Sequence, residues 1–247
     1  MRKGWTHNIA LRENKCREMY QMNNSNGSKY DKLFYPFLFE GGKVDVKEVL
    51  RQVQQSTIQK CQEVIAIRKA TMESNSQLII STGIAMAAAF SKGATLFAFG
   101  NGGSTSDAQD IVVDLFNPLY HNWKQLPTVA LTNDVSVITA VGNDVGFENV
   151  FARQIIALGR KEDIALGIST SGNSKNVIAA LKQAKKQDML TVAIAGYDGG
   201  KMARSQFVDF CLITPSDYVP RLQEAQATVY HTVLHVVQAV IANPDLY

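Results

Sequence analysis

Residues 95–116, "TLFAFGNGGSTSDAQDIVVDLF", form the stretch that decides the fold. It begins with the apolar run 95–99, continues through the glycine turn "GNGGS" (100–104) and ends in a segment of helical spacing, 104–116. A strand, a tight turn and a helix in this order make up the first half of a βαβ unit. Three aspartates, Asp107, Asp110 and Asp114, lie along the expected helix. Their negative charge behind a turn typical of phosphate sites needs a physical explanation.

The same alternation continues along the chain. Further strand candidates lie at 127–131, 163–169, 190–196 and 209–214, with helical segments at 135–157 in pieces, 173–187, 199–205 and about 220–241. Strands that are apolar throughout and alternate with helices are typical of a parallel sheet covered on both faces. We therefore predict an α/β fold with a five-stranded parallel sheet, in which ligands bind beyond the carboxyl ends of the strands.

The chain before residue 93 has a different character. Residues 1–30 are polar and aperiodic, and the aromatic segment "KLFYPFLFE" (32–40) should dock on the body or on a neighbouring subunit. From 45 to 91, apolar residues recur every three or four positions, which predicts two long helices. We predict an N-terminal extension (1–44), partly disordered or a docking arm, and a folded domain (45–247).

Composition and charge exclude several classes of protein. Of the 247 residues, 46% are hydrophobic and 19% charged, and the formal net charge is +3. Residues 1–22 hold five basic and two acidic residues, so the rest is balanced and offers no footprint for nucleic acid. No apolar run reaches the ~20 residues of a membrane-spanning helix. Three cysteines without CxxC spacing predict neither a disulfide framework nor a zinc finger, and fit a reducing cytoplasm.

A second polar turn, "ISTSGNS" (168–174), follows the strand candidate 163–168. Its hydroxyls surround Gly172 at the start of a helix, where free N–H groups and the helix dipole attract anions. The turn has no lysine of the GxxxxGK[ST] type, which excludes a nucleotide P-loop. A serine-rich turn with one helix-capping hydroxyl is the structural alternative, but it would need only one such group. The phosphate interpretation uses Ser169, Thr170, Ser171 and Ser174.

The aspartates of the first turn and helix fall into two groups. Ser104 followed by Asp107 has capping-box spacing, which predicts that Asp107 caps the helix. Asp110 and Asp114 stand four apart on one helical face, where like charges are unfavourable. A cation, a proton on one carboxylate, or solvent exposure would each compensate.

The last helix carries a polar stripe of Gln223, Gln226, His231 and His235. The two histidines stand four apart and could hold a metal, although HxxxH without an HExxH context is a weak signal. A lone histidine in a helix is more often a core or surface residue than a ligand.

Five segments together resemble the sugar isomerase (SIS) domains of the phosphoheptose isomerase group. They are "FGNGGSTSDAQ", "AVGNDVGFENVFARQI", "GISTSGNSKNVIAAL", "GYDGGKMA" and "RLQEAQATVYH", in that order within residues 45–242. The resemblance implies a three-layer α/β/α sandwich, flavodoxin-like, in a homotetramer with active sites at subunit interfaces. It implies phosphate binding by the four hydroxyl residues of 169–174. The implied lining of the sugar site is Asn101, Gly102, Gly103, Ser104, Asn143, Asp144 and Gln223.

The resemblance also implies a metal and an acid–base pair. The family's first helix typically reads "DAQHFAAEL", in which the His and the Glu hold zinc with a Gln and a His of the last helix. Here Asp110 and Asp114 replace that His and Glu, while Gln223 and His231 persist. Asp114 and His231 then become the base and acid of an enediol mechanism. Pro118 and Pro220 are further departures from the family pattern. Because two of the four ligands are then carboxylates, the site could also bind metal ions that are harder than zinc.

We therefore predict a cytoplasmic aldose–ketose isomerase of a phosphorylated sugar, most directly sedoheptulose 7-phosphate, with zinc as cofactor and no nucleotide. One alternative is a non-catalytic SIS module that binds a sugar phosphate or a protein, like the initiator-associating protein. Another SIS isomerase, such as a hexulose-phosphate isomerase, is a third interpretation, because the phosphate loop is shared.

Overall fold

The computed structural model describes residues 46–243, so the predicted extension 1–44 and the segment "KLFYPFLFE" lie outside the described residues. The chain divides into two compact units, residues 1–62 and 63–247. Within the described residues, the first unit consists of the beginning of helix α3 (Val46–Ser91), and the second holds the sheet and the candidate site. Among these residues, no helix is both long enough and apolar enough to cross a lipid bilayer.

The second unit is built on five parallel strands. They are β1 (Leu96–Gly100), β2 (Thr128–Ala130), β3 (Ile164–Ser169), β4 (Leu190–Gly196) and β5 (Phe210–Thr214), in the order β2-β1-β3-β4-β5. Every neighbouring pair is parallel. All five residues of β1 and all six of β3 are buried, which explains why the central strands read as continuous apolar runs. The predicted five-stranded parallel sheet is confirmed.

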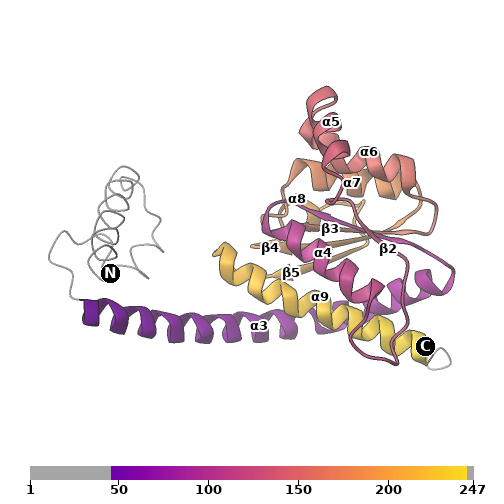
Figure 1. The fold of residues 1–247 in the computed structure, drawn as a ribbon. Coiled ribbons are helices and arrows are strands. Elements are labelled where there is room, and N and C mark those ends of the chain that lie inside the picture. Colours follow the sequence, from indigo (N-terminus) through magenta and orange to yellow (C-terminus); the bar gives the residue numbers. More distant parts are fainter. Residues whose placement is uncertain (1–45, 244–247) are drawn as a thin grey trace, which may run out of the picture. The chain divides into compact units, whose positions relative to one another are not determined.

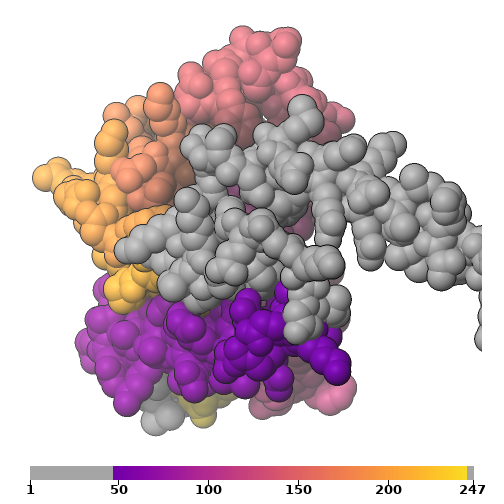
Figure 2. Space-filling model, turned by 90° about the vertical axis from the view of Figure 1, so that its left-hand side faces the viewer, coloured from indigo at the N-terminus to yellow at the C-terminus, as the bar shows by residue number. Residues whose placement is uncertain are grey.

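Helices cover both faces of this sheet (Figure 1). One face carries the second part of α3 with α4 (Gly103–Phe116) and α9 (Val219–Ala242). The other carries α5 (Val135–Asp144), the short 3-10 helix η2 (Phe147–Asn149), α6 (Val150–Leu158), α7 (Lys175–Lys186) and α8 (Gly200–Ala203). Figure 2 shows α5 and α6 at the surface, at the opposite edge of that view from the part of α3 after residue 62.

Two hydrophobic cores fill the spaces between the three layers. Alternate residues of β1 point to opposite faces, so Leu96 and Ala98 pack under α4 and α9, whereas Phe97 and Phe99 pack under α6 and α7. The three-layer α/β/α architecture expected from the resemblance is confirmed.

The prediction of two long helices between 45 and 91 was wrong, because α3 is one helix of 46 residues. Gly83, the only glycine in it, does not break the helix but lets α9 approach closely. A Cβ atom at residue 83 would lie 2.5 Å from Cγ1 of Val236. The helix-weakening effect of glycine, about 1 kcal/mol, is thus offset by packing between α3 and α9.

The strand order reverses between β1 and β3, since the chain leaves β1 toward β2 on one side and β3 toward β4 on the other. Such a switch point forms a crevice beyond the carboxyl ends of the two strands. The turns that sequence analysis singled out, 100–104 and 168–174, follow these two strands directly.

Candidate active site

A reciprocal amide pair joins the two turns at the switch point. Nδ2 of Asn101, after β1, donates to Oδ1 of Asn176 in α7 at 2.8 Å, and Nδ2 of Asn176 donates to Oδ1 of Asn101, also at 2.8 Å. Asn176 is 3% exposed, so the pair is shielded from competing water. The two turns are therefore fixed to each other. Sequence analysis missed Asn176 because its partner lies 75 residues away.

The turn after β3 is held by its own hydroxyls and backbone; we call residues 169–174 the phosphate loop. Oγ of Ser169 and Oγ of Ser174 lie 2.9 Å apart, and the N–H of Asn173 donates to Oγ of Ser171 at 3.2 Å. Thr170 is half-buried. Ser174 stands at the N-cap position of α7 but makes no side-chain cap hydrogen bond. The structural alternative, a simple capping serine, therefore has no support from the hydrogen bonds of this loop.

Gly172 gives the phosphate loop its shape. Its φ of +63° lies in the left-handed region, and a Cβ atom there would lie 2.1 Å from the carbonyl oxygen of Gly199. No side chain fits between the two backbones, so the loop is packed directly against the start of α8.

The turn after β1 brings Gln223 of α9 against the start of α4. A Cβ atom on Gly103 would lie 2.0 Å from Nε2 of Gln223, so a larger residue here would displace this amide from its present position against the turn. Gly102 has φ +56° and ψ −123° and stands at the N-cap of α4. The structure thus places Gly102, Gly103 and Gln223, three predicted sugar-site residues, at one helix end.

The prediction that Asp107 caps this helix was wrong. Because α4 begins at Gly103, Ser104 already lies in the first turn and Asp107 in the second, and the helix has no side-chain cap hydrogen bond. Burial, and secondarily the charge of Asp110, raise the pKa of Asp107 to about 6. Its Oδ2 atom is buried without a hydrogen-bond partner.

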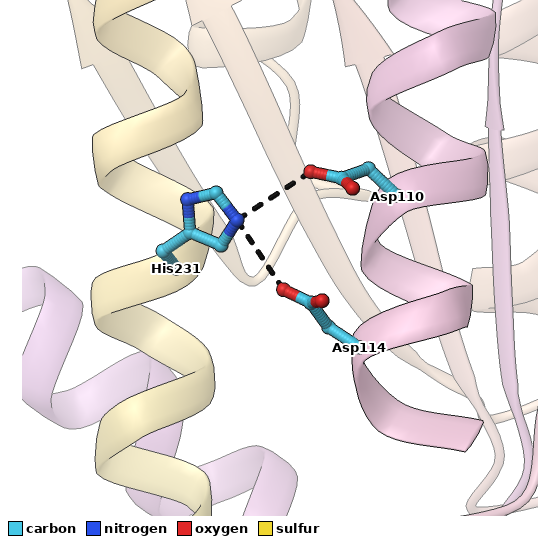
Figure 3. Close-up of side chains that lie close together, drawn as sticks. All are labelled: Asp110, Asp114 and His231. Carbon is cyan, nitrogen blue, oxygen red and sulfur yellow. Dashed lines mark ion pairs between the residues drawn. The ribbon is translucent and has the colours of Figure 1, made fainter. Parts of the chain in front are cut away.

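Asp110 and Asp114 of α4 converge on His231 of α9 (Figure 3). Nε2 of His231 lies 3.4 Å from Oδ2 of Asp110 and 3.2 Å from Oδ2 of Asp114. We call these three residues the Asp–His cluster. The hydroxyl of Tyr230 donates to Oδ2 of Asp110 at 2.7 Å. Solvent exposure alone, one of the three compensations considered for this pair, does not describe these contacts.

The cluster has an uneven electrostatic environment. Burial first, and then the charge of Asp110, raise the pKa of Asp114, while His231 and His235 oppose the rise. Burial and the hydrogen bond to Asp110 raise the pKa of Tyr230 well above its usual range, so its hydroxyl stays protonated and donates. The side chain of Asp114 is 24% exposed and that of Asp110 is 48% exposed. Asp114 is therefore the more protected of the two carboxylates, and its pKa is raised above the ordinary value of an aspartate.

The donor set of the cluster fits a divalent cation. Each of Asp110, Asp114 and His231 offers one ligand atom, and these atoms all lie within 4.8 Å of one another. Carboxylate oxygens and an imidazole nitrogen are ordinary ligands of zinc, manganese and iron ions.

Other residues of the predicted stripe and sugar site lie elsewhere. His235 packs edge-on against the ring of Trp123, with centroids 4.9 Å apart. Gln226 is fully buried. Asn143 donates to Oδ1 of its neighbour Asp144 at 2.7 Å, at the end of α5 on the opposite face of the sheet from α9. Within this chain, Asn143 and Asp144 are thus not brought to the Asp–His cluster.

Three comparisons with known proteins agree on one family. The model of the SIS domain family matches residues 59–196. The phosphoheptose isomerase of Roseiflexus sp. (strain RS-1) is 40% identical over 181 residues, which cover 73% of this chain and 91% of that protein. The phosphoheptose isomerase of Sulfurimonas denitrificans is 46% identical over 139 residues, which cover 56% of this chain and 70% of that protein.

Among solved structures, the phosphoheptose isomerase of Neisseria gonorrhoeae matches with a TM-score of 0.69 and 34% identity, covering 76% of this chain and all of that chain. The likeness thus extends over sequence and fold. The chain belongs to the SIS domain family and, within it, to the group of the phosphoheptose isomerases. The resemblance on which sequence analysis relied is confirmed.

Proposed function

We propose that this protein is a phosphoheptose isomerase that interconverts sedoheptulose 7-phosphate and a heptose 7-phosphate. The observation that carries the proposal is the convergence of Asp114 and His231, whose Oδ2 and Nε2 atoms lie 3.2 Å apart, in a SIS fold that also has a hydroxyl-rich loop at its switch point. Relatives that match most of this chain bear the name of that activity.

The phosphate end of the substrate would bind the phosphate loop. Ser169, Thr170, Ser171 and Ser174 offer hydroxyl donors, and the N-terminus of α7 adds its dipole and free N–H groups. These neutral donors bind a phosphate without a lysine. The sugar chain would then extend toward the turn after β1, where Asn101, Gly102, Gly103, Ser104 and Gln223 line its path.

Proton transfer is assigned to Asp114 and His231. Aldose–ketose isomerisation moves one proton between adjacent carbons through an enediol, so it needs a base at carbon and an acid at oxygen. Asp114 removes the proton from the carbon beside the carbonyl group, and its raised pKa makes it a stronger base than an exposed aspartate. His231 donates a proton to the carbonyl oxygen, which gives the enediol. Asp114 then returns its proton to the former carbonyl carbon while His231 takes the proton of the adjacent hydroxyl group, which becomes the new carbonyl group.

A zinc ion is the proposed cofactor, held by Asp110, Asp114, Gln223 and His231. When bound, a divalent cation at these donors supplies Lewis-acid stabilisation of the negative oxygen of the enediol. The two aspartates supply harder ligands than imidazole, so manganese or iron would also suit the site. Elemental analysis of the purified protein measures the metal directly.

A homotetramer in the cytoplasm, with Asn143 and Asp144 supplied across a subunit interface, is the proposed assembly. Their position on the opposite face of the sheet from α9 supports a role in a neighbouring subunit's site. The proposed division into an extension (1–44) and a SIS domain (45–247) predicts that a chain starting at residue 45 still folds. Light scattering of the full-length protein and of the chain that starts at residue 45 measures the mass of each assembly.

The decisive experiment is isomerisation of sedoheptulose 7-phosphate by the purified protein, with and without added zinc. We expect turnover that rises with the metal. Tight binding of sugar phosphates without turnover, across a panel of heptose and hexose phosphates and several divalent cations, would contradict the proposal and favour a non-catalytic binding module.

A further inference from the structure

The two carboxylates of the Asp–His cluster compete for one nitrogen. Oδ2 of Asp110 and Oδ2 of Asp114 both face Nε2 of His231, at 3.4 and 3.2 Å. When no cation is bound to Nε2, its single N–H group points along one direction, so it makes a good hydrogen bond with only one of the two acceptors. Left to itself, the imidazole would be shared between the proposed base and a second carboxylate of the same charge.

Tyr230 supplies Asp110 with a donor of its own. The phenol hydroxyl lies 2.7 Å from Oδ2 of Asp110, which is 0.7 Å closer than the nitrogen of His231. A hydrogen bond from a hydroxyl to a charged carboxylate is among the stronger types. Asp110 therefore has its main partner in Tyr230, and the imidazole is left to Asp114.

The body of Tyr230 also restrains the imidazole. The centroids of the Tyr230 and His231 rings lie 4.5 Å apart, with an interplanar angle of 55°. Tyr230 is only 4% exposed and belongs to the core between the sheet and the α4–α9 layer, whereas the side chains of Asp110 and His231 are about half exposed. A fixed, buried side chain thus touches two exposed ones, which on their own would turn toward water.

We infer that Tyr230 is a positioning residue of the isomerase: its hydroxyl fixes Asp110 and its ring steadies His231, so that Asp110, Asp114 and His231 keep the arrangement of the cluster. This role rests on the proposed function for its catalytic consequence. Tyr230 does not touch the reacting atoms and acts through Asp110 and His231. A merely structural tyrosine would need a partner for its hydroxyl but would have no influence on the imidazole.

The test uses three variants: Tyr230→Phe, Asp110→Asn, and the double variant that combines these two substitutions. Each is compared with the control variant Thr232→Val. Phenylalanine keeps the ring and removes only the hydroxyl. Thr232 lies on the same helix, and its hydroxyl donates to the carbonyl oxygen of Thr228 at 2.7 Å, so Thr232→Val is the control for losing one hydroxyl from α9. Steady-state kinetics with sedoheptulose 7-phosphate give kcat and KM for each protein.

We expect Tyr230→Phe to lower kcat about 10-fold to 100-fold, with KM changed less than threefold, because supporting hydrogen bonds to site residues typically act on this scale. When Asp110→Asn is already present, adding Tyr230→Phe should lower kcat less than twofold further, since the effect of Tyr230 passes through Asp110. Thr232→Val should keep wild-type kinetics. Wild-type kcat in Tyr230→Phe, or full additivity with Asp110→Asn, would overturn the inference.

A second measurement does not depend on turnover. In protein labelled with ¹⁵N-histidine, the His231 ring signals, identified with His231→Ala, should shift in Tyr230→Phe and stay unchanged in Thr232→Val. Unmoved His231 signals in Tyr230→Phe would refute the positioning role. If the signals move but the wild-type protein turns over no sugar phosphate, the proposed function fails and the positioning of His231 by Tyr230 stands.

Discussion

The phosphate loop and the Asp–His cluster are built in different ways. The loop is held by contacts between near neighbours, such as the Ser169–Ser174 hydroxyl pair, and by backbone packed on backbone at Gly172. The cluster is assembled from side chains of two helices more than 100 residues apart in sequence, and the side chains of Asp110 and His231 are about half exposed. The loop is thus preformed by its backbone, whereas the cluster depends on how α4 packs against α9.

Under the proposed function, this difference would separate substrate binding, at the loop, from proton transfer, at the cluster. Variants of the loop should weaken substrate binding or the fold, and variants of the cluster should slow turnover. The experiments below test that separation, beginning with the largest expected effect.

Asp114→Asn and His231→Ala should each lower kcat by about 10²-fold to 10⁴-fold, the usual contribution of a general acid or base. Substrate binding, measured by calorimetry, should change far less, because the phosphate loop is intact. His235→Ala is the control, since His235 lies one turn further along α9 and packs on Trp123. If both cluster variants kept wild-type turnover, the cluster would have no acid–base role.

Gly172→Ala should lower the free energy of unfolding by about 2 kcal/mol or more, because the new Cβ meets the carbonyl oxygen of Gly199 and φ is positive. For a chain of this size the midpoint of thermal unfolding should fall by roughly 4–8 °C. Gly93→Ala is the control: φ there is +90°, but a Cβ atom meets nothing within 4 Å. An equal loss in both variants would show that the close approach at Gly172 contributes nothing.

Ser174→Ala should raise the inhibition constant of inorganic phosphate, and the KM of the sugar phosphate, about 10-fold, as expected for one hydrogen bond to a charged group. Its kcat should stay within a few-fold of wild type. Ser81→Ala, which removes a hydroxyl bonded only to its own helix, should change neither constant. A large fall in kcat with unchanged KM would mean that loop and cluster are not separate in function.

Asp107→Asn should raise the free energy of unfolding near neutral pH and leave it unchanged at about pH 4. The pKa of Asp107 is about 6 in the folded protein against an ordinary 3.8, so the folded state holds this proton more tightly than the unfolded state. Stability conferred by protonated Asp107 is complete below about pH 4 and is lost as the pH rises to 6. The variant should therefore be more stable at pH 7.5 by about 1 kcal/mol, discounted for partial exposure, and equal at pH 4. Thermal unfolding at the two pH values measures the difference in stability between the variant and the wild type. An equal difference at both pH values would contradict the raised pKa.

The sheet could be predicted from sequence because strands buried on both faces are continuous apolar runs, such as 96–100 and 164–169. The turn 169–174 after β3 could also be predicted, since its hydroxyl residues and its glycine are neighbours in the chain, whereas its role in phosphate binding stays a prediction. The helix count before the sheet could not be predicted, because a glycine such as Gly83 has the same appearance at a break and at a close helix contact.

The contacts that organise the site lay beyond sequence reasoning. Tyr230 and Asp110 are 120 residues apart, and nothing in the pattern of α9 shows which neighbour a phenol reaches. The error at Asp107 has a related cause. Capping-box spacing predicts a cap only if the helix begins just after Ser104, and the glycine turn lets α4 begin earlier.

The amide pair between Asn101 and Asn176 has a consequence for exchanging parts between relatives. Each asparagine donates to and accepts from the other, so removing either one breaks two hydrogen bonds in a shielded place. The turn after β1 and the segment that follows the phosphate loop should therefore be transferred together when segments are exchanged between related proteins. A phosphate loop transplanted from another protein would stay fixed to the turn after β1 only if it arrived with an asparagine at 176 to match Asn101.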